Sequence, residues 1–315
     1  MKLLYPTSLE LDTDKLEGFA ALLQPYDVTA PLPPEHYDAD ILVTWGNSAA
    51  TLKNAAEHLR KLSWVQSLAA GPNDVLKAGF SPSVTVTSGS GLHDHTVAEH
   101  TLGLLLNAAR RFYRMRDAQN ARRWAEHLGG PQPDRPEDSF RTLEDARILV
   151  WGFGNIARTL APVLRSLGSY VRGVARSAGV RDGTEVFTES ALPKLLPETD
   201  VLIMILPGSD ATQHALSGER LALLPPHAWV VNVGRGSSLD EAALLAALHA
   251  GKLGGAALDV FETEPLPEAS PLWDAPNLIV SPHAAGGRPQ GAEALIAENL
   301  RRFLAGQPLK NVVER

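Results

Sequence analysis

The sequence contains no cysteine among its 315 residues. This absence excludes disulfide bonds, thiolate zinc sites and a catalytic thiol, and it fits a protein of the cytoplasm. No apolar run approaches the roughly eighteen residues of a membrane span, and a proline and acidic residues follow Met1 too soon for a signal peptide. From the sequence we therefore expect a cytoplasmic protein without a membrane partner.

An excess of positive charge is also absent. The chain has 29 Lys and Arg against 36 Asp and Glu, which gives a net charge of −7. Nucleic-acid-binding proteins normally present a basic face, so no nucleic-acid partner is expected. Charged residues make up 21% and hydrophobic residues 44%, the balance of an ordinary soluble protein. The length suggests two domains, each able to bury its own core.

A short apolar run at 148–151 leads directly into Gly152-x-Gly154-x-x-Ala157, and a segment that can form a helix follows. A strand that turns tightly into a helix leaves unpaired backbone N–H groups aimed at one point, which suits a pyrophosphate. Glycines after a strand also occur in ordinary turns, but the flanking strand and helix that the motif requires are both present. We therefore expect a dinucleotide site. The residues expected to contact the cofactor here are Gly152, Phe153, Gly154, Asn155 and Ile156.

Short apolar segments alternate with helical patterns on both sides of this motif. The alternation predicts an α/β fold with two doubly wound parallel-sheet domains. The expected strands lie at 3–5, 27–29, 41–45, 65–69, 84–87, 148–151, 170–174, 201–205, 229–233, 256–258 and 278–280. The expected helices include 15–23, 52–62, a long segment at 96–123 and a last helix at 291–304, and a loop rich in glycine and proline is expected at 129–136.

A carboxylate is missing where the ribose of a dinucleotide would bind. About twenty residues beyond the glycines, an acidic residue normally holds the ribose diol of NAD. After the strand at 170–174 this sequence has Ala175, Arg176 and Ser177 instead. Arginine binds phosphate through charge-assisted hydrogen bonds, so these residues suit the 2′-phosphate of NADP. A solvated surface arginine is the alternative for Arg176, but its position favours the phosphate.

Polar residues follow three later strands, at the point where each strand ends. They are Arg235, Glu264 and His283. Because the carboxyl ends of parallel strands form the binding crevice, we expect these side chains to converge. An arginine for an anionic substrate, an acid and a histidine that the acid can orient are suited to acid–base chemistry on a carbonyl. Each residue alone could be ordinary loop polarity; their joint occurrence favours catalysis.

These motifs resemble the D-isomer-specific 2-hydroxyacid dehydrogenase family, and the resemblance covers nearly the whole chain. The matching stretches are Gly152-Phe-Gly-Asn-Ile-Ala157, Asn232-Val-Gly-Arg-Gly236, Leu258-Asp-Val-Phe-Glu-Thr-Glu-Pro265, Ser281-Pro-His-Ala284 and Thr96-Val-Ala-Glu-His-Thr-Leu-Gly-Leu104. The resemblance implies a Rossmann-like cofactor domain and a flavodoxin-like substrate domain, with the last helix returning to the latter. The expected substrate-binding domain is 1–94 with 288–315, and the expected dinucleotide-binding domain is 95–287.

The resemblance also implies roles for individual residues. Arg235 would hold the substrate carboxylate and carbonyl, and His283 would donate the proton in reduction. Glu264 would tune and orient His283, and Asp259 would contact the nicotinamide carboxamide. Further cofactor contacts are expected at Thr101, Leu206, Pro207, Val233 and Gly234. A homodimer is also implied, in which Trp124 reaches the active site of the partner.

Two stretches depart from the commoner family pattern. Many members have Gly-Val-Gly-x-Asp where this chain has Ala69-Ala-Gly-Pro-Asn73, yet the backbone N–H groups of Ala70 and Gly71 can still bind a carboxylate. A second stretch, 88–94, replaces Asn-Ala-Pro-Gly, so Trp45 and His93 are candidates either to line the substrate pocket or to serve packing alone. His93, His95 and His100 lack a matching distant ligand set, so no metal site is expected.

The expected function is the reduction of a small 2-oxo acid by NADPH to the D-2-hydroxy acid, with glyoxylate and hydroxypyruvate as the first candidates by family likeness. A nucleotide-sensing interaction module with little turnover is the alternative, but a pure binder does not need Arg235, Glu264 and His283 together. A formate-type dehydrogenase is a third option. The pairing of Glu264 with His283 suits a protonated imidazole and hence carbonyl reduction.

Overall fold

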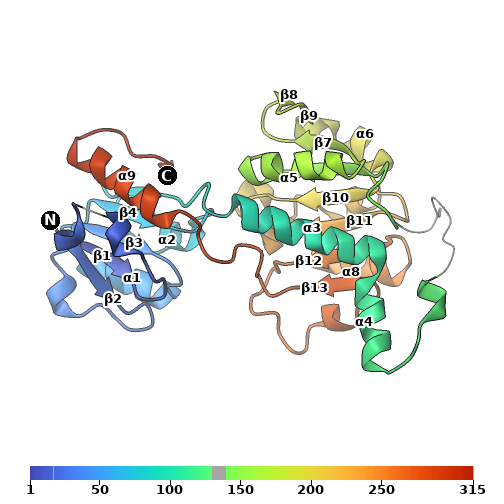
Figure 1. The fold of residues 1–315 in the computed structure, drawn as a ribbon, viewed down its shortest axis with the longest axis horizontal. Helices are drawn as coiled ribbons and strands as arrows, with labels where there is room; N and C mark the ends of the chain where they lie inside the picture. The colour runs from blue at the N-terminus through green and yellow to red at the C-terminus, as the bar shows by residue number, and fades with distance from the viewer. Residues whose placement is uncertain (17, 130–139, 315) are drawn as a thin grey trace. The chain divides into compact units, whose positions relative to one another are not determined.

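The computed structural model describes residues 1–16, 18–129 and 140–314. The chain divides into two compact units, Met1–His93 with Arg288–Arg315, and Asp94–Gly287. Each unit is built on one sheet with helices on both faces, which confirms the predicted α/β class (Figure 1). None of the helices in these described ranges is both long and apolar enough to cross a bilayer. Most of the predicted loop at 129–136 lies outside the described residues.

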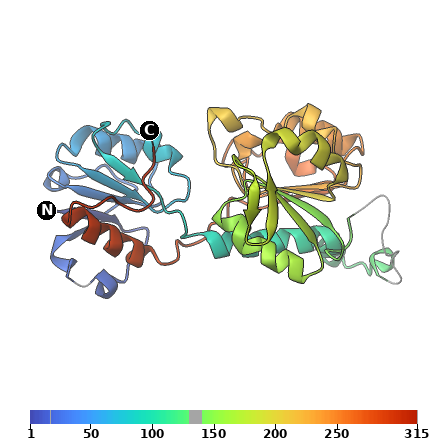
Figure 2. The same ribbon diagram turned by 90° about the horizontal axis from the view of Figure 1, so that it is seen from above.

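The first unit contains a five-stranded parallel sheet in the order β2-β1-β3-β4-β5, the strand order of flavodoxin-like folds. Its strands are β1 (Leu3–Pro6), β2 (Leu23–Tyr26), β3 (Ile41–Thr44), β4 (Trp64–Ser67) and β5 (Thr85–Thr87). Helices α1 (Ala49–His58) and α2 (Asn73–Lys77) pack on one face, and α9 (Ala292–Leu304) packs on the other (Figure 2).

The C-terminal segment joins this first sheet through buried polar contacts. Asn299 of α9 donates from Nδ2 to Oε1 of Gln66 at 2.9 Å, and both side chains are fully buried. The backbone N–H of Val313 donates to the carbonyl oxygen of Val86 at 2.9 Å. Because buried amides are costly unless they are paired, these contacts fix the place of α9 on the sheet.

Two sequence expectations for the first unit are wrong. The predicted helix at 15–23 is replaced by two short 3-10 turns, because Gly18 has a φ of 86° that no right-handed helix accepts, and β2 already begins at Leu23. The predicted strand at 27–29 is a turn instead. There the carboxylate of Asp27 accepts from both the backbone N–H and the hydroxyl of Thr29, which ends the strand at Tyr26.

The second unit contains an eight-stranded sheet in the order β13-β12-β11-β10-β6-β7-β9-β8, parallel except for the β8–β9 pair. Without β8, this is the order of the Rossmann fold extended by one strand. The strands are β6 (Arg147–Trp151), β7 (Tyr170–Val174), β8 (Gly179–Arg181), β9 (Thr184–Phe187), β10 (Val201–Met204), β11 (Trp229–Asn232), β12 (Gly255–Leu258) and β13 (Leu278–Val280). Strands β8 and β9 were not predicted from the sequence.

Helices cover both faces of this sheet (Figure 2). On one face lie α3 (Asp94–Arg110) and α5 (Asn155–Ser166); on the other lie α6 (Leu192–Leu195), α7 (Gly218–Leu221) and α8 (Glu241–His249). The predicted long helix at 96–123 is interrupted: Arg111 has a left-handed φ of 55°, so α3 ends and α4 (Phe112–Asn120) begins in a new direction (Figure 1).

Short 3-10 helices complete both units. They are Thr13–Leu16, Ala20–Leu22, Pro34–His36, Glu126–Leu128, Glu189–Ala191, Leu196–Glu198, Asp210–Thr212, Gly236–Ser238 and Pro271–Asp274.

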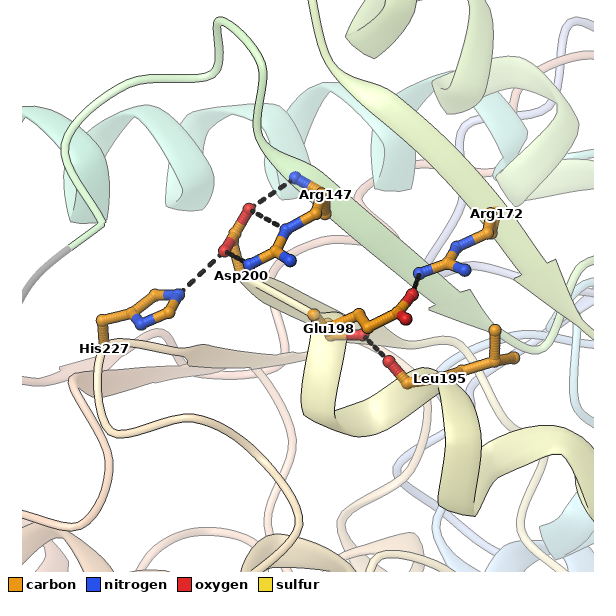
Figure 3. Close-up of polar contacts among 7 residues, drawn as sticks. Arg147, Arg172, Leu195, Glu198, Asp200 and His227 are labelled. Carbon is orange, nitrogen blue, oxygen red and sulfur yellow. Dashed lines mark hydrogen bonds and ion pairs between the residues drawn. The ribbon is translucent and has the colours of Figure 1, made fainter. Parts of the chain in front are cut away.

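An ionic cluster joins the amino-terminal ends of three strands of the larger sheet (Figure 3). Asp200, just before β10, accepts from the backbone N–H of Arg147 at 2.7 Å, from its guanidinium at 2.8 and 3.1 Å, and from Nε2 of His227 at 2.8 Å. Burial alone would raise the pKa of Asp200, but the bonds from Arg147 and His227 hold it below its ordinary value. Beside this cluster, Arg172 of β7 pairs with Glu198 at 3.1 Å.

Candidate active site

His283 and Glu264 form a hydrogen-bonded pair beyond the carboxyl ends of β12 and β13. Nδ1 of His283 lies 2.7 Å from Oε2 of Glu264, and the other carboxylate oxygen accepts from the N–H of Phe261 at 2.9 Å. Both side chains keep surface accessible, 45% for His283 and 34% for Glu264. Because Nδ1 faces the carboxylate, Nε2 is the ring nitrogen that can serve a substrate.

Asp259, at the end of β12, anchors the loop that carries His283. Its carboxylate accepts from the hydroxyl of Ser281 at 2.6 Å and from the N–H groups of Ala284 and Ala285 at 2.8 and 2.9 Å. Its carbonyl accepts from the N–H of His283 at 2.8 Å. The φ of His283 is 52°, a left-handed value that is unfavourable for this residue and that these bonds offset.

The carboxylate of Asp259 is fully buried, and its oxygens face this loop. The contact with a nicotinamide carboxamide implied by the resemblance therefore stays a prediction.

His100 of α3 also lies at this loop, which was not predicted from the sequence. Its Nε2 lies 3.0 Å from the hydroxyl of Ser281 and 3.3 Å from Oδ1 of Asp259. His100 therefore ties α3 to the same loop.

Arg235 follows β11 and lies next to the Glu264 segment. Its Nη1 donates to the carbonyl of Gly234 at 2.7 Å. A Cβ on the adjacent Gly236 would lie 1.8 Å from the carbonyl carbon of Phe261, so only glycine allows the two loops to approach this closely. The structure thus brings the three predicted catalytic residues together within one unit.

The charges around the pair shift both pKa values in the direction that favours an ion pair. The hydrogen bond to Glu264 raises the pKa of His283, while burial and the positive charge of Arg235 oppose this rise. Burial would raise the pKa of Glu264, but the bonds from His283 and Phe261 and the nearby cations lower it below its ordinary value. The site is therefore suited to hold a protonated imidazole beside a carboxylate.

The glycine loop after β6 has the geometry of a phosphate site. Gly152 has a φ of 101°, and a Cβ there would lie 2.4 Å from the carbonyl oxygen of Ile205. Gly154 is exposed, and an added Cβ would meet nothing within 4 Å. Among the described residues, none is recorded as accepting from the backbone N–H groups of Asn155 and Ile156, which open α5. These donors and the helix dipole fit a pyrophosphate.

The side chain of Phe153, in the same loop, is buried. It is 2% exposed, and a Cβ on Gly173 would lie 2.4 Å from its ring, so the ring is packed into the core. Any cofactor contact of Phe153 must therefore come from its backbone. The predicted contact of Thr101 meets a similar obstacle, because its hydroxyl is fully buried and donates to the carbonyl of Val97 at 2.7 Å.

The segment after β7 supplies the residues expected near the ribose. Ala175 is partly buried, whereas Arg176 and Ser177 are exposed. The hydroxyl of Ser177 accepts from Nη2 of Arg181 at 2.9 Å. Arg181 was not predicted; its signal in the sequence is the Asp182-Gly183 dipeptide, a strong indicator of a hairpin. Because no carboxylate stands at 175–177, the residues present fit a 2′-phosphate.

The remaining predicted cofactor residues lie at the carboxyl ends of β10 and β11. Leu206, Val233 and Gly234 are buried, and Pro207 is exposed. A Cβ on Gly234 would lie 2.6 Å from the backbone of Leu206, so these two segments are in close contact. At this part of the sheet edge, the exposed Pro207 and the partly buried Arg235 leave surface that a ligand can reach.

Apart from Arg235 and His283, the predicted substrate residues lie in the first unit. Trp45 and Gly71 line a cavity of about 180 Å³ beyond the ends of β3 and β4, together with Thr44, Ser67 and Asp74. His93 is buried, its Nε2 lies 2.8 Å from the carbonyl oxygen of Leu68, and its ring stacks on Trp45 with 5.3 Å between centroids. Ala70 is exposed and does not line this cavity.

The described parts of the chain contain no group of three or more possible metal ligands.

Comparison with known proteins decides the family. The sequence model of the D-isomer specific 2-hydroxyacid dehydrogenase NAD binding domain matches residues 102–285. The chain belongs to this family. It is 32% identical over 308 residues to a glyoxylate/hydroxypyruvate reductase A from Serratia proteamaculans, which covers 95% of this chain and 94% of the relative.

Solved structures of this dehydrogenase family resemble the whole chain. A family member from Xanthobacter autotrophicus in complex with NADPH and MES has a TM-score of 0.81 at 31% identity, covering 99% of this chain and 98% of that one. An NADPH-dependent glyoxylate/hydroxypyruvate reductase from Sinorhizobium meliloti, in complex with NADP and sulfate, has a TM-score of 0.80 at 26% identity, covering 100% and 98%.

Membership in the 2-hydroxyacid dehydrogenase family confirms the resemblance noted in the sequence. The protein is an oxidoreductase with a Rossmann domain that binds NAD or NADP. Its own geometry is consistent with that class, because the His283–Glu264 pair and the glycine loop lie at the same sheet edge.

Proposed function

We propose that this dehydrogenase reduces a small 2-oxo acid to the D-2-hydroxy acid with NADPH, and that glyoxylate and hydroxypyruvate are its first candidate substrates. The observation that carries the proposal is the 2.7 Å contact between His283 and Glu264 beside Arg235. The names of the reductases from Serratia proteamaculans and Sinorhizobium meliloti support the substrate class.

In this proposal each of the three side chains has one task. The nicotinamide supplies a hydride when it is bound. Nε2–H of His283 gives its proton to the carbonyl oxygen as negative charge develops there, and Glu264 favours the protonated imidazole by raising the pKa of His283. The planar guanidinium of Arg235 binds the substrate carboxylate through paired hydrogen bonds. Reduction of a carbonyl requires a donor of this kind, whereas hydride transfer from formate does not.

The preference for NADPH rests on the segment after β7. An aspartate at position 175 would accept from the ribose hydroxyls of NAD and repel a 2′-phosphate, but Ala175 cannot do either. Arg176 is exposed there and can reach a phosphate. A hydrogen bond to a charged group is worth about 1.5–3 kcal/mol, or about ten- to a hundredfold in kcat/KM. The double substitution Ala175→Asp with Arg176→Ala should reverse the preference.

A kinetic panel of 2-oxo acids crossed with NADPH and NADH tests the function. We expect turnover of at least one two- or three-carbon oxo acid, with kcat/KM for NADPH about ten- to a hundredfold above that for NADH. Equal use of NADH would make Arg176 a surface arginine and end the cofactor proposal. Nucleotide binding without turnover of any oxo acid would instead favour the nucleotide-sensing module.

We further propose that the enzyme is a homodimer and that Trp124 contacts the partner subunit. Trp124 is 89% exposed, and Phe112 and Met115 of α4 are also accessible. Tryptophan is rarely left in water to this extent unless a partner covers it. Light scattering should give twice the 33.8 kDa of one chain, and Trp124→Ala should weaken the association. A mass near 33.8 kDa at working concentration would refute the dimer.

A further inference from the structure

An arginine outside the recognised motifs joins the two loops of the dinucleotide site. Arg181 is the last residue of β8, in the hairpin at the edge of the larger sheet (Figure 1). The turn that follows is Asp182-Gly183, with φ values of 48° and 75°, and it connects the paired residues Arg181 and Thr184. Two-residue turns of this kind set the register of a hairpin, so the position of Arg181 is well defined.

We propose that Arg181 is a positioning residue for the 2′-phosphate of NADPH, which it serves by holding Ser177 and the glycine loop in one arrangement. This inference rests on the NADPH preference proposed above. Nη1 of Arg181 donates to the carbonyl of Phe153 at 2.6 Å, and Nη2 donates to both the carbonyl and the hydroxyl of Ser177 at 2.9 Å. One guanidinium therefore bridges two segments that are 24 residues apart in the chain. A lysine lacks the planar fork needed to do this.

Within this hairpin, Val186 of β9 is buried in the core, whereas β8 is held by further arginines. Val180 of β8 is 74% exposed, so little hydrophobic contact fixes this strand. Instead, Arg158 of α5 binds the carboxylate of Asp182 at 2.5 and 3.2 Å. Arg165 of the same helix donates to the carbonyl of Asp182 at 3.1 Å and to the hydroxyl of Thr184. Arg181 is thus supported from α5, the helix whose first turn faces the pyrophosphate.

The contacts of Arg181 prepare Ser177 to donate. A hydroxyl has one proton and two acceptor lone pairs, and here Arg181 occupies an acceptor position. The proton of Ser177 is then directed away from the guanidinium and can be given to a phosphate oxygen. Arg181 adds a second fixed positive charge, whereas Arg176 is exposed. In this arrangement Arg176 meets the phosphate and Arg181 holds the site ready for it.

Calorimetry can measure the binding of two nucleotides in the absence of any oxo acid, which separates this role from catalysis. Adenosine 2′,5′-bisphosphate carries the discriminating phosphate, and 5′-AMP lacks it. The unmodified protein should prefer the bisphosphate by about ten- to a hundredfold. Arg181→Met should reduce this preference by about tenfold, and Arg181→Lys should recover only part of the loss, because it restores the charge without the bridge. Arg172→Met, which removes the partner of Glu198 (Figure 3), should leave the preference unchanged.

A second variant keeps the test decisive if Arg181→Met does not fold. Ser177→Ala removes the hydroxyl alone, so it should lower the preference several-fold while AMP affinity stays the same. A bisphosphate preference that survives Arg181→Met, or that survives Ser177→Ala where Arg181→Met does not fold, would overturn the role of Arg181 alone. An unmodified protein that binds the two nucleotides equally would overturn the NADPH preference and, with it, this inference.

Discussion

The two edges of the eight-stranded sheet carry the same three residue types in different arrangements. The amino-terminal edge has Arg147, Asp200 and His227, and the carboxyl-terminal edge has Arg235, Asp259 and His283. At the first edge, Asp200 is the common acceptor of the hydrogen bonds from Arg147 and His227 (Figure 3). At the second edge the aspartate serves a loop, and the histidine takes a separate carboxylate.

The difference shows that a buried aspartate with a histidine beside it does not identify an active site. In the cluster of Asp200, the carboxylate accepts hydrogen bonds from Arg147 and His227 and joins the starts of three strands. By contrast, the His283–Glu264 pair retains accessible surface and stands on a loop with a left-handed residue, held there by Asp259. A strained backbone that the surrounding structure holds in place, together with accessible charged groups, is a feature of functional sites.

Substitution of one histidine at a time should show the difference between the two edges most clearly. His283→Ala removes the proton donor and should lower kcat by about 10²- to 10⁴-fold while NADPH still binds. His227→Ala should leave kcat nearly unchanged and lower the free energy of unfolding by about 1–3 kcal/mol, because Asp200 loses a partner. Steady-state kinetics and denaturant unfolding measure both effects. Near-normal kcat in His283→Ala would end its assignment as the acid.

Substitution of the two aspartates should likewise affect kcat at Asp259 and stability at Asp200. Asp259→Asn replaces one of the two carboxylate oxygens with an NH2 group, so the N–H of either Ala284 or Ala285 faces a donor and loses its acceptor. The loop of His283 should shift, with a loss of about 10²-fold in kcat. Asp200→Asn should reduce stability with little change in kcat. If both variants lowered kcat equally, Asp259 would have no special role in positioning His283.

The two arginines should show the smallest of these contrasts in rate. Arg235→Lys replaces the planar fork and should raise KM for the oxo acid by about tenfold, with a lower kcat and nearly unchanged cofactor affinity. Arg147→Lys should alter neither constant, because its partner is Asp200. Weakened binding of NADPH alone in Arg235→Lys would assign the residue to the nucleotide site instead.

Much of the second unit was predictable because its strands are short, apolar and separated by glycine or proline. The strands at 170–174 and 278–280 occur as expected, and the residues that follow the strand ends came together because parallel strands share an edge. The sequence motifs that predict roles for His283, Glu264 and Arg235 depend on the same geometry.

The features that were not predicted from the sequence depend on backbone angles and on long-range polar contacts. Nothing in its pattern showed that Arg111 would adopt a left-handed φ and divide a long helix. The hairpin of β8 and β9 is too short and too polar to appear as strands, although its Asp182-Gly183 turn was a usable signal. The contacts of Arg181 and His100 join residues far apart in the chain, which no local pattern reveals.

The pH dependence of reduction in the unmodified enzyme and in Glu264→Gln tests the central claim most directly. His283 must be protonated to act as the acid, so the rate should fall as pH rises through its pKa. The carboxylate of Glu264 raises that pKa, against the lowering effect of burial and Arg235. Removing the negative charge should therefore lower the pKa and move the falling limb of kcat to lower pH. A limb at the same pH in both proteins would contradict the account, because the proton would not come from an imidazole paired with Glu264.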